Sequence, residues 1–375
     1  MKKIILLLAA LLPFVMVSCE KPEKGSDDVV GTSGKMLVKK MTAKGTLASH
    51  DNDDDDGYYD YYRSQSSQKI DATFTFAYAD GKMSRLSASG SYANVYDEEQ
   101  SYNGNVVKNH EEENFSGKGK VSFTYNGDVM DLGITVQGES SGKDIYEPDR
   151  YDENEEWSES GSLSGNYILN MENGIAVSGK GTFKSDEGTY TTDKIKFGYD
   201  NSDQLTSLYY EGEYEYRTEI KWQNGNMVNV GWYDDDDYKA GKKHPIMRPL
   251  GKKRAKAAKS GSIVWHDWLR VEYSSKENKS NIDISRIIFT YLATDYPEMG
   301  IGVFGFLGKE SKNLPSKVYA NGEDWNEETG EYEEKEVEYL SFDYEFNKDG
   351  AVKKIKISSP VEGYDKANAT IEFEY

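Results

Sequence analysis

The chain has 375 residues, of which 37% are hydrophobic and 30% charged, and its formal net charge at pH 7 is −21. So acidic a protein repels phosphate groups, and the composition therefore argues against a nucleic acid partner. Cys19 is the single cysteine, which excludes an intrachain disulfide and a zinc site built from cysteines. The length suits one large β domain or two of ordinary size.

Residues 1–18 have the form of a lipoprotein signal peptide. Lys2 and Lys3 precede an uncharged apolar run, 4–17, that is too short to be a spanning helix. The run closes on Met16-Val17-Ser18-Cys19, which resembles a bacterial lipobox. Lipidation of Cys19 would anchor the protein to a membrane. Glu20 resembles the residue found in lipoproteins released to the outer membrane, so we expect a lipid-anchored outer-membrane protein, on the periplasmic face or at the cell surface.

Residues 19–35 are rich in Gly and Ser and predict a flexible tether after the lipidated cysteine. The remainder, 36–375, predicts one β domain. Its most regular stretch alternates apolar and charged residues from Tyr210 to Trp222, followed by the turn Asn224-Gly225 and a returning strand that ends near Tyr233. We interpret 210–222 as one long strand.

The same unit of alternating aromatic residues, a tight turn and a returning apolar strand recurs five more times. The other turns lie at Asp80-Gly81, Asn126-Gly127, Asn173-Gly174, 200–204 and Asp349-Gly350. Longer connections are expected at 94–115, 143–160, 233–262 and 321–336. Short turns at one end and long loops at the other predict an all-β, antiparallel up-and-down meander that closes into a barrel or forms a strongly curved sheet.

One segment departs from the β pattern. Apolar residues recur at helical spacing from Ile284 to Leu292, and Pro297 lies beyond them. We expect one short helix packed on the sheet.

The lipobox, the repeated hairpins, Asn224-Gly225-Asn226-Met227-Val228 and the stretch from Phe304-Gly305 to Asn313-Leu314-Pro315-Ser316-Lys317-Val318 together resemble an uncharacterised family of Gram-negative envelope lipoproteins. That family is described as a domain of unknown function with a porin-like fold. The resemblance implies a porin-like β domain over most of the chain after the tether. It implies no catalytic residue, because the family has no assigned chemistry.

Two arrangements of such a barrel remain open. The arm 210–222 is long enough to cross a bilayer, which would make the protein a membrane-spanning, pore-like barrel. Other predicted strands carry charges on their apolar faces, such as Lys353 and Asp267, and a charge facing lipid costs about 2–4 kcal/mol. We expect a barrel that stands in water with its aromatic faces turned inward.

Aromatic residues in acidic loops are the candidate ligand-binding residues. These are Tyr58, Tyr59, Tyr61, Tyr62, Trp157 and Trp325. Aromatic rings in loops are able to stack on sugar rings, so a glycan or envelope polymer is a candidate partner. The alternative is that these rings hold the loops against the barrel.

A basic segment, 239–259, carries nine lysine and arginine residues within this acidic protein. It predicts either docking to anionic head groups, lipopolysaccharide phosphates or acidic glycans, or a solvated loop that offsets the acidic runs.

Motifs with known chemistry are incomplete. The sequence that begins at His110 does not complete the zinc-protease motif H-E-x-x-H. The G-x-S-x-G match at Gly138–Gly142 is not followed by a predicted helix, which a serine nucleophile of this type requires. The segment from Asn52 resembles the start of a calcium-binding loop, but Arg63 stands where a glutamate ligand is needed. We therefore expect no cofactor, no metal and no enzymatic activity, and a binding or structural role, against the alternative of an enzyme that uses loop carboxylates.

Overall fold

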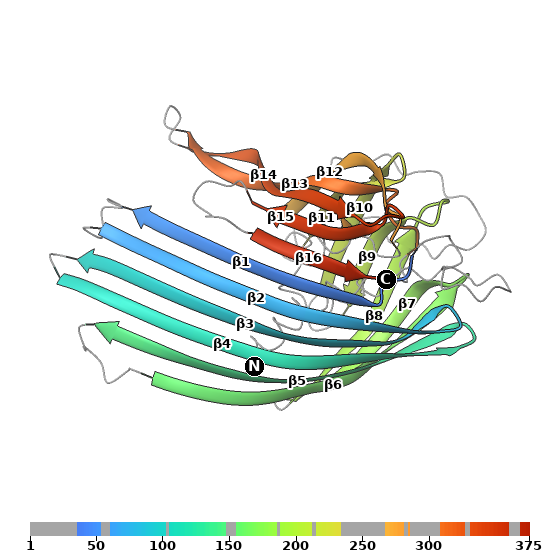
Figure 1. The fold of residues 1–375 in the computed structure, drawn as a ribbon, viewed down its shortest axis with the longest axis horizontal. Helices are drawn as coiled ribbons and strands as arrows, with labels where there is room; N and C mark the ends of the chain where they lie inside the picture. The colour runs from blue at the N-terminus through green and yellow to red at the C-terminus, as the bar shows by residue number, and fades with distance from the viewer. Residues whose placement is uncertain are drawn as a thin grey trace.

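The fold is described from a computed structural model, in which the described residues are 36–53, 61–102, 105–147, 155–185, 188–211, 215–233, 267–280, 284–285, 308–326, 331–359 and 368–375. These residues form sixteen strands (Figure 1). The strands are β1 (Lys40–Asp53), β2 (Tyr61–Ala79), β3 (Lys82–Tyr102), β4 (Asn105–Asn126), β5 (Val129–Glu147), β6 (Glu155–Glu172), β7 (Ile175–Ser185), β8 (Gly188–Tyr199), β9 (Leu205–Glu211), β10 (Glu215–Gln223), β11 (Asn226–Tyr233), β12 (Asp267–Glu277), β13 (Asn313–Asn326), β14 (Glu331–Phe346), β15 (Val352–Ser358) and β16 (Asn368–Glu374).

The strands of the described chain form one closed barrel in which each strand pairs with its neighbours in sequence. All pairings are antiparallel, and β1 closes the barrel against β16, with Met41 opposite Phe373 and Ala43 opposite Ile371. The predicted all-β, up-and-down meander is therefore confirmed, and of the two forms expected it is the closed barrel.

The six predicted hairpins are also confirmed, and two of their turns illustrate the type I′ geometry. Asn224 and Gly225 have φ angles of 52° and 78°, and Asp80 and Gly81 have 51° and 73°. Two successive positive φ angles define the type I′ turn, whose twist matches that of paired strands, and only Gly, Asn and Asp adopt them at low cost. These turns join β10 to β11 and β2 to β3.

The interpretation of 210–222 as one strand is wrong. β9 ends at Glu211, β10 begins at Glu215, and the two strands pair, with Glu215 opposite Glu211 and Tyr216 opposite Tyr210. The chain thus reverses direction between Glu211 and Glu215. Both paired positions keep the same face, so the apolar–charged alternation runs through the reversal without a change of phase and hides it.

Three of the expected long connections are also wrong, because strands continue through them. β3 ends at Tyr102, and β4 begins at Asn105. β5 ends at Glu147, and β6 begins at Glu155. Only 327–330 separate β13 from β14. The fourth, 233–262, lies almost entirely outside the described residues. Of the expected helix, only Ile284 and Ser285 are described, and both are helical and buried.

The apolar residues face the inside of the barrel. Phe74, Leu132 and Leu169 are fully buried, and they belong to one continuous cluster that includes residues of nearly every strand. Burying such a side chain stabilises the fold by about 1.5–3 kcal/mol. We call this face of the sheet the inner face and the opposite one the outer face; Thr75 and Lys120, each next in sequence to a buried residue, are exposed on the outer face.

The outer face carries ion pairs around the closure of the barrel. Lys40 lies 2.7 Å from Glu374, and Lys354 lies 2.9 Å from Glu372. Other outer pairs are Lys44–Asp71, Arg270–Glu272, Arg270–Glu336, Lys317–Glu338 and Lys356–Glu345. Among the described residues, the only exposed large hydrophobic side chains are Val106 and Phe346. The wall is therefore apolar inside and charged outside.

The recurring aromatic residue before or beside the tight turns has a common structural role. A tyrosine hydroxyl or tryptophan N–H in or just after an even-numbered strand donates to a backbone carbonyl at or near the start of the preceding strand, at 2.6–2.9 Å. The pairs are Tyr78–Val38, Tyr125–Met83, Tyr199–Ala176, Trp222–Leu205, Tyr273–Met227, Tyr344–Pro315 and Tyr375–Val352. We call these the aromatic latches. Each latch ties the turn end of one strand to the backbone at the start of the strand before it.

Removing one latch hydroxyl is expected to destabilise the barrel measurably. Tyr344→Phe leaves the carbonyl oxygen of Pro315 without its 2.6 Å donor, which costs about 1–3 kcal/mol for a buried acceptor. Chemical unfolding in urea measures the change. The matched control is Tyr319→Phe, which keeps the ring that Arg270 stacks on and removes only a hydroxyl with an exposed 3.5 Å bond to Glu272; its loss should cost less than about 0.5 kcal/mol. Equal midpoints for the two variants would contradict a role for the latch.

The latches also predict sensitivity to alkaline pH. Burial raises the pKa of Tyr375 to about 12 and raises the pKa of Tyr344 well above its usual value near 10. A raised pKa in the folded state means that the stabilisation is complete below pH 10 and is lost as the pH rises toward 12. The urea midpoint should fall steeply between these values. A Tyr344→Phe/Tyr375→Phe variant should lose part of this dependence; an unchanged slope would disprove the assignment.

Candidate functional site

Five consecutive strands extend well beyond the rest of the barrel. β2 to β6 have 18–22 residues, whereas β7 to β12 have 7–12 and β15 and β16 have seven each. At about 3.3 Å per residue, the additional length amounts to roughly 25 Å or more. Figure 1 shows the ends of β1 to β6 reaching far to the left, together with the β13–β14 hairpin.

A row of glycines marks the place where the apolar core gives way to this extension. Gly90, Gly117, Gly138 and Gly161 lie opposite one another on β3 to β6. On the inner face the ring of Phe115 covers the row, so that a Cβ on Gly138 would lie 2.5 Å from a ring carbon. The glycines therefore make room for one aromatic ring at the upper limit of the core.

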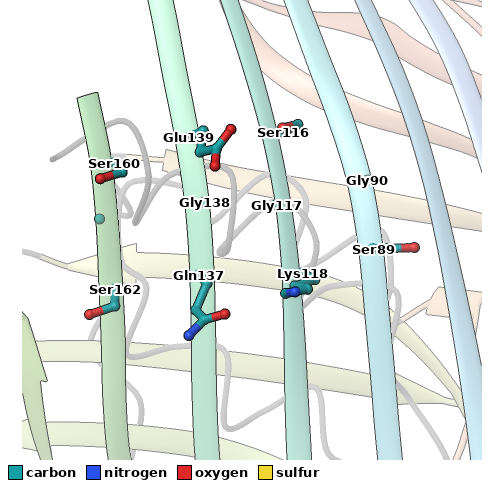
Figure 2. A pocket seen from close by; sticks show the side chains of 11 residues that line it. Ser89, Gly90, Ser116, Gly117, Lys118, Gln137, Gly138, Glu139, Ser160 and Ser162 are labelled. Atoms are coloured by element: carbon teal, nitrogen blue, oxygen red, sulfur yellow. The ribbon is translucent and has the colours of Figure 1, made fainter. Parts of the chain in front are cut away.

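The outer face of the same row is hollowed. A shallow polar depression of about 730 Å³ is lined there by Ser89, Ser116, Lys118, Gln137, Glu139, Ser160 and Ser162, together with the four glycines (Figure 2). Figure 2 shows these side chains on four neighbouring strands. Its floor of glycine and serine follows from the packing of Phe115 on the other face.

Beyond the glycine row, the inner face changes from apolar to acidic and aromatic. Alternate residues of a strand lie on the same face, and β3 to β6 pair without a register shift. The residues that share the face of the buried Leu86, Val121 and Ile134 can therefore be read along each strand. They are the carboxylates Glu98, Glu111, Glu113, Asp144 and Glu159, the aromatic residues Tyr92, Tyr96, Tyr146 and Trp157, and the amides Asn94 and Asn109. All are half-buried or exposed. We call this surface the acidic wall.

Trp157 lies flat on the wall because a glycine faces it. Gly142 is directly opposite Trp157, and a Cβ there would lie 2.4 Å from the indole ring. Glu113 follows on the other side of Gly142, and Asn94 is opposite Glu113. One row across β3 to β6 thus places an amide, a carboxylate and an indole ring side by side.

Acceptors outnumber donors on the wall. Tyr96 donates its hydroxyl to Glu98 at 2.8 Å, and the amide nitrogen of Asn109 donates to Glu111 at 2.8 Å. The side-chain oxygens of Asn94 and Asn109 are buried and have no hydrogen-bond partner among the described residues. A buried acceptor without a donor is costly, so these oxygens favour a ligand that brings N–H or O–H groups.

The outer face of the long strands β2 to β6 differs from the inner face, because it carries ion pairs between acidic and basic side chains. His110 lies 2.6 Å from Asp97 and 3.1 Å from Glu112, and Lys108 lies 2.9 Å from Glu99. These hydrogen bonds raise the pKa of His110 and lower the pKa of Asp97, so each favours the charged form of the other. They line an outer depression of about 760 Å³.

Of the sequence-predicted ligand residues, only Trp157 has a described side chain. Tyr58 and Tyr59, like Cys19 and the basic segment 239–259, lie outside the described residues. Tyr61 and Tyr62 begin β2, and Trp325 lies in β13 opposite Tyr332; their side chains are outside the description. Trp157, expected in a loop, lies in β6. Of the predicted aromatic residues, it is the one whose described side chain belongs to the acidic wall.

The carboxylates and amides of the wall were not predicted, although the sequence carries a signal for them. The residues of β3 at alternate positions after Leu86 include Gly90, Tyr92 and Tyr96, so the aromatic alternation continues beyond the apolar core. The segment that resembles the start of a calcium-binding loop is part of a strand, because Asn52 lies in β1 opposite Arg63. Within the described ranges, no three His, Cys, Asp or Glu side chains are grouped to hold a metal ion. The same residues contain no helix long and apolar enough to cross a membrane.

Comparison with known proteins finds matches among solved structures alone. No protein-family model and no curated protein match the chain. Among solved structures, a porin-like protein from Bacteroides uniformis is similar over 90% of this chain and 96% of its own, with 12% identity and a TM-score of 0.46. The translocator domain of the autotransporter NalP from Neisseria meningitidis is similar over 90% and 88%, with 8% identity and a TM-score of 0.23. The described strands themselves show that the chain is an antiparallel β-barrel protein.

Proposed function

We propose that the protein is a cell-envelope lipoprotein of the outer membrane, anchored through Cys19, whose barrel stands in water and serves as a non-enzymatic binding module. The observation that carries this proposal is the polarity of the barrel wall, which is apolar inside and charged outside. Phe373 and Ile371 of β16 are buried inside, whereas their neighbours Glu372 and Glu374 form ion pairs outside.

A pore-like barrel needs the opposite arrangement, with an apolar band toward lipid and a polar interior. Placing a charged side chain in lipid near the midplane costs about 2–4 kcal/mol. The closure of the barrel alone, from β14 to β2, carries Lys354–Glu372, Lys356–Glu345 and Lys44–Asp71 on its outer face. In water these exposed pairs cost nothing and stabilise the fold slightly. A barrel in water also gives a lipid anchor a purpose, because nothing else would hold the protein at the membrane.

The acidic wall supports binding rather than a purely structural role. A structural barrel has no need for acceptor oxygens that remain buried without a donor, such as those of Asn94 and Asn109. Aromatic rings beside convergent polar groups are the usual composition of a ligand site. The alternative of a glycan surface formed by loop aromatic residues has less support, because Trp157 lies in a strand.

The anchor is tested by Cys19→Ala in the full chain, expressed in a Gram-negative host. We expect the natural chain in the membrane fraction and the variant in the soluble periplasmic fraction, folded and β-rich by circular dichroism. Ser18→Ala, which keeps a small residue before the cysteine, should stay membrane-bound. Retention of the Cys19→Ala variant in the outer membrane, with release only by detergent, would contradict the proposal. Protease added to intact cells then distinguishes the surface from the periplasmic face.

A further inference from the structure

We propose that one end of the barrel is the surface that faces the membrane holding the Cys19 anchor. This is the turn end, which carries the hairpin turns 80–81, 126–127, 173–174, 200–204, 224–225 and 349–350. The opposite end, to which β2 to β6 extend, is the long-strand end. The inference rests on the proposed lipoprotein and adds to it the face that meets the lipid surface. It is carried by the place where the chain enters the barrel, the bonds that fix this place and the charges around it.

The chain enters the barrel from the turn end. β1 begins there at Lys40 and ends at Asp53, at the long-strand end. Just before β1, the carbonyl oxygen of Val38 accepts a 2.8 Å hydrogen bond from the hydroxyl of Tyr78, which lies beside the turn between β2 and β3. Figure 1 shows β1 pointing away from that turn, toward the ends of the long strands. The segment that precedes β1 therefore approaches the barrel at its turn end.

Met36 is held in place at the turn end by three contacts. Its backbone N–H donates to the carbonyl oxygen of Lys279 at 3.2 Å, and the residue forms a parallel bridge with Ser280. The side-chain amide of Asn347, in the turn between β14 and β15, donates to the sulfur of Met36 at 3.8 Å. Ser280 is 1% exposed, so this contact belongs to the packed interior. The point at which the predicted tether 19–35 reaches the barrel is thus fixed.

The residues that hold this entry point are bonded to further turns. The backbone N–H of Asn278 donates to the carbonyl of Lys312, and the N–H of Lys312 donates to that of Gly225, each at 2.9 Å. The N–H of Lys309 donates to the carbonyl of Asp203 at 2.8 Å. Asn278, Lys309 and Lys312 belong to the connection between β12 and β13, which therefore joins the turns of two other hairpins. The entry point is a fixed part of the turn end.

The anchor segment is short compared with the barrel. A coil of the length of 19–35 spans about 20–25 Å on average. β4 has 22 residues, which at the rise of a strand and the usual tilt in a barrel corresponds to a height of about 50–60 Å. The bilayer stops the barrel from tilting past the horizontal. An anchor at Cys19 therefore keeps the turn end near the membrane and leaves the long-strand end farther away.

The charge around the entry point favours the same orientation. In the segments that meet there, five exposed lysines stand against two acidic residues. The lysines are Lys39, Lys279, Lys309, Lys312 and Lys348, and the acidic residues are Glu310 and Asp349. Asp200 and Asp203 border this group beside Lys309. The chain as a whole has a net charge of −21. An anionic lipid surface attracts this basic region and repels the acidic remainder of the protein.

The test measures energy transfer from a thiol-linked fluorescein to rhodamine-labelled lipid. The intact lipoprotein is reconstituted into preformed vesicles of phosphatidylcholine and phosphatidylglycerol. The anchor consumes the thiol of Cys19, the single cysteine, so an introduced cysteine is the reactive one. The matched labels are Thr124→Cys and Val106→Cys, both exposed on the outer face of β4 near its two ends. We expect about threefold higher transfer from Thr124→Cys, because the positions are about 60 Å apart along the strand.

A third label, Ser275→Cys, distinguishes an upright barrel from one that lies on its side. Ser275 is exposed near the turn end of β12, on the side of the barrel opposite β4. We expect its transfer to be within about twofold of that from Thr124→Cys and above that from Val106→Cys. Equal transfer from the two ends of β4, or higher transfer from Val106→Cys, would overturn the inference.

Circular dichroism of each labelled variant verifies the fold. If Val106→Cys folds poorly, Glu156→Cys replaces it, because Glu156 is exposed on the outer face of β6 at the long-strand end. Ser275→Cys replaces Thr124→Cys in the same way. The comparison of the two ends is then made with the same expected result.

The outcomes separate the orientation from the anchor. With Cys19→Ala in addition, every label should lose its transfer, as the proposed lipoprotein requires. Transfer that persists after Cys19→Ala would overturn the anchor and this inference with it. Transfer that depends on Cys19 but is equal at the two ends of β4 would overturn the orientation alone, while the anchored barrel remained.

Discussion

Leu132→Asp is expected to prevent folding of the barrel. Leu132 lies on the inner face of β5, opposite Phe123 on β4 and Tyr167 on β6, and it has no exposed surface. An unpaired carboxylate there would lose its hydration without gaining a partner, at a cost of several kcal/mol in addition to the lost apolar contacts. Domains are stable by about 5–15 kcal/mol in total, so we expect a largely unfolded or aggregated variant by circular dichroism.

The control is Thr135→Asp, three residues later on the exposed outer face of the same strand and opposite Lys120. In water this change should alter stability by less than about 0.5 kcal/mol. In lipid the order would be reversed, because a carboxylate would then face hydrocarbon at position 135. A variant pair in which Thr135→Asp is the damaging change would contradict the assignment of inside and outside.

Gly165→Ala is expected to destabilise the protein by about 1–3 kcal/mol or more. Gly165 lies on the inner face of β6 opposite Phe183 of β7. A Cβ at this position would lie 2.4 Å from the carbonyl oxygen of Thr182 and 2.5 Å from the ring of Phe183. The ring can turn, but the strand backbone has to move, which disturbs the pairing of β6 with β7.

Thermal or urea unfolding measures this loss against Ser164→Ala, an exposed outer position next to it that should be nearly neutral. Phe183→Leu combined with Gly165→Ala should recover little, because the contact with the Thr182 carbonyl remains. A midpoint equal to that of the Ser164→Ala control would show that the close approach of β6 and β7 at Gly165 is unimportant.

The hairpins could be predicted from sequence because their signals are local. A residue pair such as Asn224-Gly225 imposes its turn through its own φ angles, and the apolar residues on either side reveal the inner face within a few positions. Closure is a different matter. It depends on pairing Lys40 with Glu374, which are 334 residues apart, and no local pattern fixes the number of strands between them.

The reversal between β9 and β10 was hidden for a geometric reason. Tyr210 and Tyr216 face the same way on paired strands, so period two continues across the turn and indicates one strand where there are two. Only the length of 210–222, compared with the short returning strand β11, could have raised the question.

The acidic wall was missed because hydropathy identifies strands by one apolar face. Beyond the glycine row both faces of β3 to β6 are polar, so 94–115 and 143–160 have the composition of loops. The two faces differ there in the sign of their charges: the inner face carries acidic residues alone, and the outer face carries acidic and basic residues. This difference can be recognised only when the register shows which residues of neighbouring strands lie side by side.

The central claim is that the apolar face lies inside a barrel surrounded by water. The most direct measurement is size-exclusion chromatography with circular dichroism on residues 20–375, produced without lipid and without detergent. We expect a soluble, β-rich protein at the elution volume of a compact particle, with a cooperative urea transition. A chain that aggregates in buffer and regains β structure only in detergent or lipid would contradict the claim, because its apolar face would then be the one that meets the membrane.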